Sequence, residues 1–488
     1  MNIKMLVYIL GKVLLIEGAL MFLPISCGLI YCEKEVLYYL IMAAAYIILG
    51  FLVSMKKPKN MTIFIKDGCV ATALSWLLLS VCGCIPFILT NEIPSFTDAM
   101  FETASGFTTT GASILNNVEA LSHTSLLWRS LTHWIGGMGV LVFLLAVVPM
   151  TGGSNMNLMK AESPGPTVGK IVPKVRTTAK MLYYIYMAIT AIEIIILFVC
   201  GMPLFDSICS AFGTAGTGGF GIKNDSFTSY APHIQWIVAV FMLLFGANFN
   251  FYYYLTTRQG GKALKMSETK AYIAVAAVAT GIVCFSIYGI YGNLGDSLRH
   301  SLFQVATTMT TTGFATTDFD LWPTLAKFVL VSLMFIGACA SSTGGGIKIS
   351  RFQIMFKAIK REIQSYIHPK TVKKIHIDGK TVDTDVERSV ALYFFIYLLV
   401  FVLSMLVVSF EGHDLVTVFT SVAATLNNIG PGLAMVGPTH NYSFLSDLSK
   451  WVLIFDMIAG RLELIPVLVF LNPFTYKGII KKSPKTQS

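Results

Sequence analysis

Apolar runs long enough to cross a lipid bilayer recur along the whole chain. A membrane-spanning helix needs about 20 residues to cross a hydrocarbon core of roughly 30 Å, and only short polar gaps separate the runs of this length. We therefore predict ten spanning helices. They lie near residues 5–30, 37–55, 67–90, 125–149, 178–201, 232–256, 269–291, 325–347, 388–410 and 449–471.

The amino-acid composition agrees with a bilayer as the solvent. Hydrophobic residues make up 55% of the 488 residues and charged residues only 13%, which is too little polar surface for a water-soluble protein of this size. The first apolar run carries Lys12 and Glu17 and is not followed by a small-residue cleavage site. We expect it to be a retained helix and not a signal peptide.

Basic residues gather in alternate loops between the predicted spans, and the intervening loops are mostly acidic. Because cytoplasmic loops carry an excess of lysine and arginine, we predict that both termini are cytoplasmic. Ten spans satisfy this orientation, and an odd number would not. The basic clusters comprise Lys56, Lys57, Lys59 and Lys66; Lys160, Lys170, Lys174, Arg176 and Lys180; Arg258, Lys262, Lys265 and Lys270; Lys348, Arg351, Lys357, Lys360, Arg361, Lys370, Lys373 and Lys374; and Lys477, Lys481, Lys482 and Lys485.

The placement of charge also bears on partners and chemistry. The net charge of +10 arises largely from these loops, so we predict no nucleic-acid partner. The segment 348–374 can hold the anionic headgroups of membrane lipids or dock a cytosolic protein. The sequence has no pattern of a nucleophile with a base, of a metal triad or of a phosphate-binding loop. We therefore predict a protein that is not an enzyme and has no covalent cofactor.

One pattern occurs four times after the first two spans: a spanning helix, a shorter apolar helix, a turn with glycine, and a second spanning helix. The shorter helices, near 96–107, 205–215, 298–309 and 414–426, cannot cross the bilayer and are typical of re-entrant segments. We predict an all-α polytopic membrane protein with four pseudo-symmetric helix–pore helix–helix repeats around a central pore, plus two N-terminal spans. The predicted bounds are 1–62 for the N-terminal segment, 63–160, 161–262, 263–375 with a broken inner helix, and 376–488.

The four turns share a glycine. The first and third turns read Thr-Thr-Thr-Gly and end at Gly111 and Gly313. The second keeps Thr-Gly, which aligns Gly218 with these two, and the fourth keeps only Gly430. The alternative interpretation is that threonine and glycine simply let membrane helices approach closely.

Such turns suit a dehydrated potassium ion. Main-chain carbonyls that point the same way can replace its water without adding fixed charge, glycine reaches the positive φ that this backbone requires, and threonine hydroxyls can add oxygen atoms. Irregular backbone at membrane depth must be buried in protein or line a wet cavity, and four copies around one axis do both. We predict a potassium-binding selectivity filter at Thr109, Thr110, Gly111, Thr217, Gly218, Gly219, Thr311, Thr312, Gly313, Phe314, Asn428, Ile429, Gly430 and Pro431.

The Thr-Thr-Thr-Gly turns, the Asn-Asn-Ile-Gly-Pro-Gly turn and the fourfold organisation resemble the Trk/Ktr/HKT superfamily of potassium transporters over essentially the whole chain. Two spans before the first repeat are typical of its Trk branch, with the TrkH/TrkG-type subunit. The resemblance implies a homodimer, potassium uptake across a bacterial inner membrane, and a peripheral cytosolic nucleotide-binding regulatory subunit of the TrkA type. The second turn departs from the family at Gly216, and the fourth at Asn428 and Ile429, so neither ring of threonine hydroxyls is complete.

Three consecutive glycines, Gly344, Gly345 and Gly346, interrupt the second spanning helix of the third repeat. Each costs a helix roughly 1 kcal/mol relative to alanine, so we predict an unwound segment within the membrane. The resemblance implies that this loop acts as a gate below the filter. The alternative is a small-residue packing face whose Ser and Thr hydroxyls bond back to the helix.

Arg461 lies deep in the last apolar run. An arginine inside a membrane is costly and usually faces a polar interior, so below the filter it would repel cations. The resemblance links an arginine at this place to the closed pore. The alternative role is a structural ion pair with Glu463 or Asp456.

A proton- or sodium-coupled secondary carrier of the same fold is the rival function. Such carriers often have inverted repeats and titratable residues at broken helices, whereas the four turns here all fall on the outer side. A membrane-embedded enzyme or an assembly factor is a further alternative, which an ion-flux assay separates at once.

Overall fold

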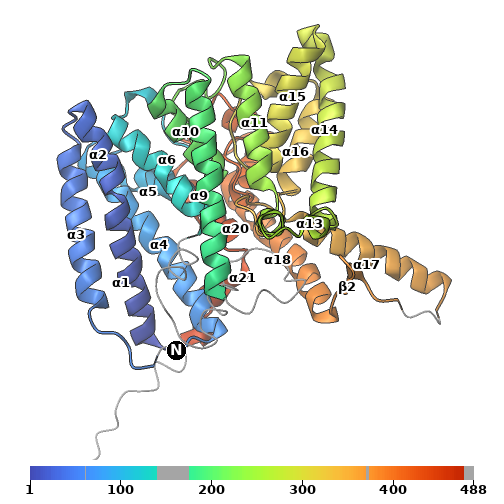
Figure 1. The fold of residues 1–488 in the computed structure, drawn as a ribbon, viewed down its shortest axis with the longest axis horizontal. Coiled ribbons are helices and arrows are strands. Elements are labelled where there is room, and N and C mark those ends of the chain that lie inside the picture. The colour runs from blue at the N-terminus through green and yellow to red at the C-terminus, as the bar shows by residue number, and fades with distance from the viewer. Residues whose placement is uncertain (61, 140–174, 370–372, 477–488) are drawn as a thin grey trace, which may run out of the picture.

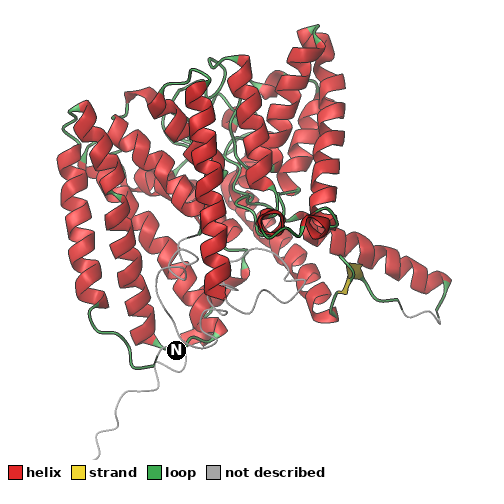
Figure 2. Ribbon diagram, viewed as in Figure 1, coloured by secondary structure: helices red, strands yellow, loops and turns green. Residues whose placement is uncertain are grey.

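Helices that run roughly side by side make up most of the chain (Figure 1 and Figure 2). The computed structural model describes residues 1–60, 62–139, 175–369 and 373–476. The predicted boundary between the first two repeats, at 160/161, and the basic tail from Lys477 lie outside the described residues.

Fewer helices cross a membrane unbroken than the sequence predicts. In the described part of the chain, six apolar stretches are long enough, and a bent pair makes a seventh. Seven of the ten predicted spans thus correspond to these stretches, and the span predicted at 125–149 lies partly outside the described residues. The six stretches are α1 (Ile3–Leu20) with α2 (Phe22–Tyr31), α3 (Val36–Ser54), α4 (Ile65–Leu89), α9 (Val175–Val199), α14 (Ser267–Tyr291) and α18 (Thr384–Ser409).

The missing spans are the second helices of the predicted repeats, which the structure divides. The span predicted at 232–256 becomes α11 (Pro232–Gly246) and α12 (Phe249–Thr256), bent by 88°. The span at 325–347 ends early in α16 (Thr324–Phe335), and that at 449–471 becomes α20 (Asp447–Arg461) and α21 (Ile465–Leu471). Irregular backbone at this depth must be shielded by protein or water. In the first repeat, α6 (His123–Met138) ends just before residues outside the described range.

The four short apolar helices form close to their predicted positions. Side-chain caps help to fix three of them: Ser95, Asn293 and Asp414 each accept a hydrogen bond from a main-chain N–H of the first turn, which satisfies a donor that the helix leaves unpaired. The fourth begins directly after Pro203, a residue that cannot extend a helix backwards. The helices are α5 (Phe96–Phe107), α10 (Leu204–Gly216), α15 (Leu294–Met309) and α19 (Leu415–Leu426).

Contacts between these elements run in a cycle. Each short helix packs on the long helix before it, in the pairs α4 with α5, α9 with α10, α14 with α15, and α18 with α19. Each second helix packs on the next short helix, in the pairs α6 with α10, α11 with α15, α16 with α19, and α20 with α5. The last pair returns to the start of the cycle, while α1 and α3 pack together at one edge of the bundle (Figure 1).

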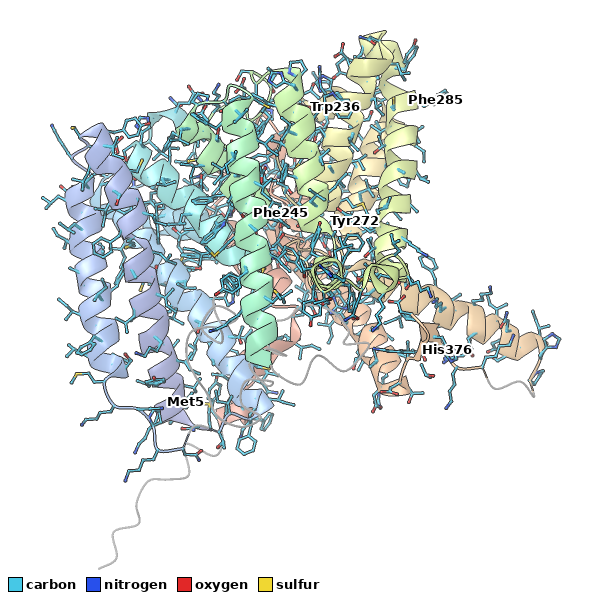
Figure 3. The ribbon with its side chains drawn as sticks, in the orientation of Figure 1. Met5, Trp236, Phe245, Tyr272, Phe285 and His376 are labelled. Carbon is cyan, nitrogen blue, oxygen red and sulfur yellow. The ribbon has the colours of Figure 1, made fainter. Side chains whose placement is uncertain are left out.

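Many large apolar side chains are exposed on the outside of the described helices. Phe285 on α14 points away from the neighbouring helices and is 82% exposed (Figure 3). Phe245 of α11 and Tyr272 of α14 are instead buried in the interior. The outer apolar belt agrees with a multi-span membrane protein.

One small region departs from the predicted all-helical fold. The strands β1 (His376–Ile377) and β2 (Lys380–Thr381) form an antiparallel hairpin with His376 opposite Thr381. Helix α17 (Ile349–Ile367) packs on this hairpin and projects sideways from the bundle (Figure 1). The remaining short elements are α13 (Gly260–Ala263) and the 3₁₀ helices η1 (Val118–Ala120), η2 (Phe319–Leu321), η3 (Ala434–Val436) and η4 (Pro473–Tyr476).

Candidate cation site

The turns that follow the four short helices share one backbone conformation. Each has a non-glycine residue in the left-handed region and, two residues later, a glycine with positive φ. The non-glycine residues are Thr109 (φ 56°), Thr217 (54°), Thr311 (58°) and Asn428 (56°). The glycines are Gly111 (φ 78°), Gly219 (78°), Gly313 (89°) and Gly430 (95°).

This pattern corrects the predicted alignment of the second turn. The sequence aligned Gly218 with Gly111, but the equivalent residue is Gly219, since the positive φ and the hydrogen bonds both match there. The N–H of Gly218 bonds the carbonyl of Gly213, five residues earlier, just as Thr110 bonds Ser105. Thr217 thus occupies the middle threonine position, which was wrongly assigned to Gly216.

The four turns meet in a closed ring. At each turn, a Cβ added to the glycine would collide with a carbonyl oxygen of the next turn, so only glycine allows this approach. The collisions pair Gly111 with the carbonyl of Gly218, Gly219 with that of Thr312, Gly313 with that of Ile429, and Gly430 with that of Thr110.

The side chains around this ring divide into two kinds. The hydroxyls of Thr110 and Thr312 contact those of Thr108 (2.8 Å) and Thr310 (2.7 Å) within their own turns, so they brace the turn. Thr109 Oγ1 is buried without a hydrogen-bond partner in the described part of the chain. A buried hydroxyl of this kind is available to a ligand.

Asn428 fills the middle position of the fourth turn and ties two repeats together. Its Nδ2 donates to Thr110 Oγ1 at 3.0 Å and to the Met457 carbonyl at 2.8 Å. The neighbouring Phe314 and Ile429 are buried, and the ring of Pro431 lies where a Cβ on Gly313 would point. The predicted filter residues of all four turns are thus brought together.

His133 on α6 bridges the first two turns. Its Nδ1 lies 2.7 Å from the Gly106 carbonyl, and its Nε2 accepts the N–H of Phe220 at 3.1 Å. These contacts require the neutral tautomer with the proton on Nδ1. The sequence feature that could have indicated this bridging role is a histidine within an apolar run.

The glycine segment of the third repeat is unwound, as predicted, and lies against the ring. After α16 the chain runs back on itself, with the Gly337 N–H bonded to the Ile347 carbonyl at 2.9 Å. The Gly345 N–H donates to Thr311 Oγ1 at 2.6 Å. A Cβ on Gly344 would lie 2.9 Å from the Thr310 carbonyl. The segment therefore touches the third turn at Thr310 and Thr311.

Lys348 belongs to this buried segment and not to the cytoplasmic cluster in which the sequence placed it. The side chain is buried, and its Nζ donates to the carbonyls of Gly344 and, at 3.1 Å, of Gly345. The unwound carbonyls lack helical partners, and the ammonium group supplies one. Arg351, also assigned to that cluster, is buried and paired with Glu463.

Arg461 joins three parts of the molecule. It donates to the Thr343 carbonyl at 2.7 Å and to the carbonyls of Gly136 and Gly137 at 2.6 and 2.8 Å. Of the two carboxylates expected as ion-pair partners, Asp456 accepts a hydrogen bond from the Ser404 hydroxyl, and Glu463 pairs with Arg351. Arg461 thus connects the C-terminal end of α20, the glycine segment and α6.

A family model described as TrkH, a cation transport protein, matches residues 39–474 of the chain. The chain belongs to the Trk family of cation transport proteins. Families of this kind consist of transporters, which confirms the prediction that the chain is not an enzyme. The resemblance noted from the turns is confirmed as well.

Members of the Trk family match over most or all of their length. The Trk system potassium uptake protein TrkH of Salmonella typhimurium is 36% identical over 419 residues, covering 84% of this chain and 85% of that protein. TrkG of Escherichia coli K12, also a Trk system potassium uptake protein, is 32% identical and covers 98% and 99%. The crystal structure of the potassium transporter TrkH from Vibrio parahaemolyticus superposes with a TM-score of 0.88 at 30% identity, covering 98% of this chain and 100% of that one.

Proposed function

We propose that this chain takes up potassium across the inner membrane of a bacterial cell, through a pore lined by the four turns. The closed ring of glycine–carbonyl contacts is the observation that carries the proposal. A ring of this kind would present main-chain oxygens from four parts of one chain to a common axis, and such oxygens replace the hydration shell of a potassium ion. The relatives are named Trk system potassium uptake proteins.

The selectivity filter in this proposal has two kinds of ligand. Carbonyls of the ring form its main part, and the Thr109 hydroxyl, which has no hydrogen-bond partner among the described residues, adds an oxygen on the inner side. The ion is substrate and passes through. The four predicted repeats, 63–160, 161–262, 263–375 and 376–488, each contribute one turn to the pore.

The gate in this proposal is the glycine segment, Gly344 to Gly346, held in place by Arg461 and Lys348. Because the segment contacts the inner end of the third turn, it obstructs the path of an ion leaving the filter. Displacing the segment opens the pore. Arg461 bonds the carbonyl of Thr343, directly before the segment, and α6, so it holds the closed arrangement.

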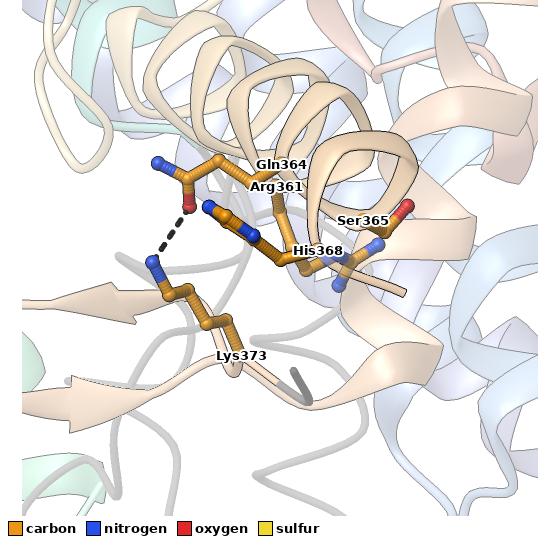
Figure 4. Close-up of a pocket in the computed structure, with 5 residues that line it drawn as sticks. All are labelled: Arg361, Gln364, Ser365, His368 and Lys373. Carbon is orange, nitrogen blue, oxygen red and sulfur yellow. Dashed lines mark hydrogen bonds between the residues drawn. The ribbon is translucent and has the colours of Figure 1, made fainter. Parts of the chain in front are cut away.

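Orientation and partners follow from charge. Basic side chains gather in a small pocket of Arg361, Gln364, Ser365, His368 and Lys373 at the end of α17, where Lys373 Nζ donates to Gln364 Oε1 at 3.0 Å (Figure 4). We assign this side and both termini to the cytoplasm. It is where anionic lipid heads and a nucleotide-binding regulatory subunit would bind.

A homodimer is the proposed assembly. One face of α17 exposes an apolar stripe that water would not favour, and a second copy of the chain would cover it. The stripe consists of Phe356, Ile359, Ile363, Tyr366 and Ile367.

A proton-coupled carrier remains the second candidate because of one observation. Glu17 of α1 is buried and has no hydrogen-bond partner in the described residues, and such carboxyl groups inside membranes often carry protons.

Voltage clamp of the purified protein in planar bilayers tests both functions. With potassium and sodium gradients imposed separately, a channel gives reversal potentials set by the potassium gradient alone. A shift of the reversal potential with the pH gradient would identify coupled proton movement. Absence of any potassium-dependent current or tracer flux would contradict the proposed function.

A further inference from the structure

A buried ion pair lies behind the ring, outside the set of residues that the filter uses. Arg129 Nε on α6 donates to Glu102 Oε1 on α5 at 2.5 Å, and the two side chains are 4% and 0% exposed. Removing charges from water costs several kcal/mol per ion. A pair at this depth therefore needs further hydrogen bonds to offset the cost, and both residues make them.

Glu102 binds the segment of chain that follows the first turn. Its Oε1 accepts the Ser113 hydroxyl and its Oε2 accepts the Ile114 N–H, both at 3.0 Å. Ser113 follows Gly111 by two residues. The carboxylate thus fixes the chain where it leaves the ring.

Arg129 binds the segment of chain that follows the second turn. Its Nη1 donates to the Gly221 carbonyl at 2.8 Å, and its guanidinium carbon lies 3.6 Å from the centre of the Phe220 ring. Phe220 and Gly221 directly follow Gly219. The pair is therefore a cross-link between two adjacent quarters of the ring.

The other pore helices have no charge at the position of Glu102. Counting back from the equivalent glycines Gly219, Gly313 and Gly430, the matching residues are Ser210, Gln304 and Ser421. Gln304 is buried with neither side-chain polar atom bonded in the described residues. The cross-link is thus particular to the contact between the first and second turns.

We propose that Glu102 and Arg129 are positioning residues that set the spacing of the first and second turns and so the selectivity for potassium over sodium. This inference rests on the proposed function. Selection by a carbonyl ring depends on the size, number and stiffness of its ligands. Without the cross-link, the two turns can approach further and accept the smaller sodium ion.

The test measures the potassium-to-sodium permeability ratio from bi-ionic reversal potentials. A single substitution leaves a buried charge uncompensated, so the main variant is Glu102→Gln with Arg129→Gln, which removes both charges at similar volume. We expect the ratio to fall by about tenfold, the scale of coupling within one hydrogen-bond network, while current is retained. The matched control is Asp296→Asn with Arg299→Gln, a paired aspartate and arginine near the N-terminal end of α15, with an unchanged ratio.

Each outcome is decisive. A folded, conducting double variant with the wild-type ratio overturns the inference. If the double variant does not fold, Ser113→Ala and Phe220→Leu each remove one contact of the pair, and wild-type ratios in both overturn it as well. A wild-type protein that conducts no potassium contradicts the proposed function instead, so the two failures are distinguishable.

Discussion

Gly219 illustrates how much a single atom can decide at the ring. Its φ of 78° and its contact with the Thr312 carbonyl exclude a side chain, whereas Gly412 has a φ of 77° in open space. The two glycines share the same backbone strain and differ in surroundings. Substitution at both separates the effect of the contact from that of the conformation.

Gly219→Ala is expected to lower potassium flux by at least about tenfold, because forcing atoms into a packed site costs roughly 1–3 kcal/mol. Gly412→Ala carries the same conformational penalty and should retain flux. Potassium uptake into proteoliposomes, normalised to protein, measures both. Equal losses in the two variants would show that the contact with Thr312 is unimportant.

Arg461→Ala is expected to raise potassium flux by roughly tenfold, since a hydrogen bond to a charged group contributes about 1.5–3 kcal/mol and the glycine segment loses one such bond at Thr343. Arg388→Ala, at an exposed position of α18, is the control. Tracer flux in proteoliposomes is the measurement, and an unchanged rate for Arg461→Ala would count against the gate.

Candidate site residues could be predicted from the sequence where the residue type itself is unusual for a membrane helix. Thr-Gly turns and an intramembrane arginine stand out in any apolar sequence. The register of the second turn was not predictable, because Gly216, Gly218 and Gly219 offer three glycines and only the backbone angles select among them. Lys348 was misplaced since its charge resembles that of its neighbours in sequence.

At the scale of elements, the four short apolar helices were predicted within a few residues because apolar runs and capping residues mark both their length and their start. The broken inner helices were predicted only in part. Three glycines indicate the break after α16, whereas the 88° bend before α12 falls at Ala247 and Asn248, where the Asn248 side chain caps the first turn of α12. Tertiary contacts decide such breaks.

The cap of α19 provides a test at this scale. Asp414 accepts the N–H and the hydroxyl of Thr417, and these hydrogen bonds hold the pKa of Asp414 below its ordinary value. Asp414→Ala should destabilise the protein by about 1 kcal/mol, while Asp414→Asn keeps an acceptor and should lose less. Thermal unfolding in detergent measures the difference.

The lowered pKa of Asp414 sets the direction of the pH dependence. A carboxyl with a depressed pKa in the folded protein stabilises it above the unfolded pKa, and this contribution disappears as the pH falls through the folded pKa. The gap between wild type and Asp414→Ala should therefore be full at neutral pH and shrink in acid. A gap that widens in acid would contradict the capping role.

At the scale of the whole molecule, the apolar stripe of α17 locates the proposed dimer contact. Ile363→Cys and Tyr366→Cys should form intermolecular disulfides under mild oxidation above the background of the native cysteines. Lys357→Cys, on a face where Lys357 bonds the His376 carbonyl, should not. Non-reducing electrophoresis of membranes measures the yields, and equal yields at the three positions would contradict this contact.

The overall architecture was predictable because lipid restricts a chain to helices that satisfy their own hydrogen bonds. The position of α17 was not, because an amphipathic helix can pack on protein, lipid or another copy with the same pattern. The cyclic order of contacts depends on which helix packs on the next predicted repeat. That choice is made by side-chain packing between elements far apart in the sequence, so the sequence pattern did not predict it.

The ring of turns is drawn from one polypeptide, and this has an evolutionary consequence. In a channel assembled from identical subunits, any mutation near the ion appears in every subunit at once. In the proposed filter, a codon change alters one quarter of the ion's surroundings and leaves the other three as they were. Threonine in three quarters and asparagine in the fourth is a combination that only such an unequal pore can explore, one step at a time.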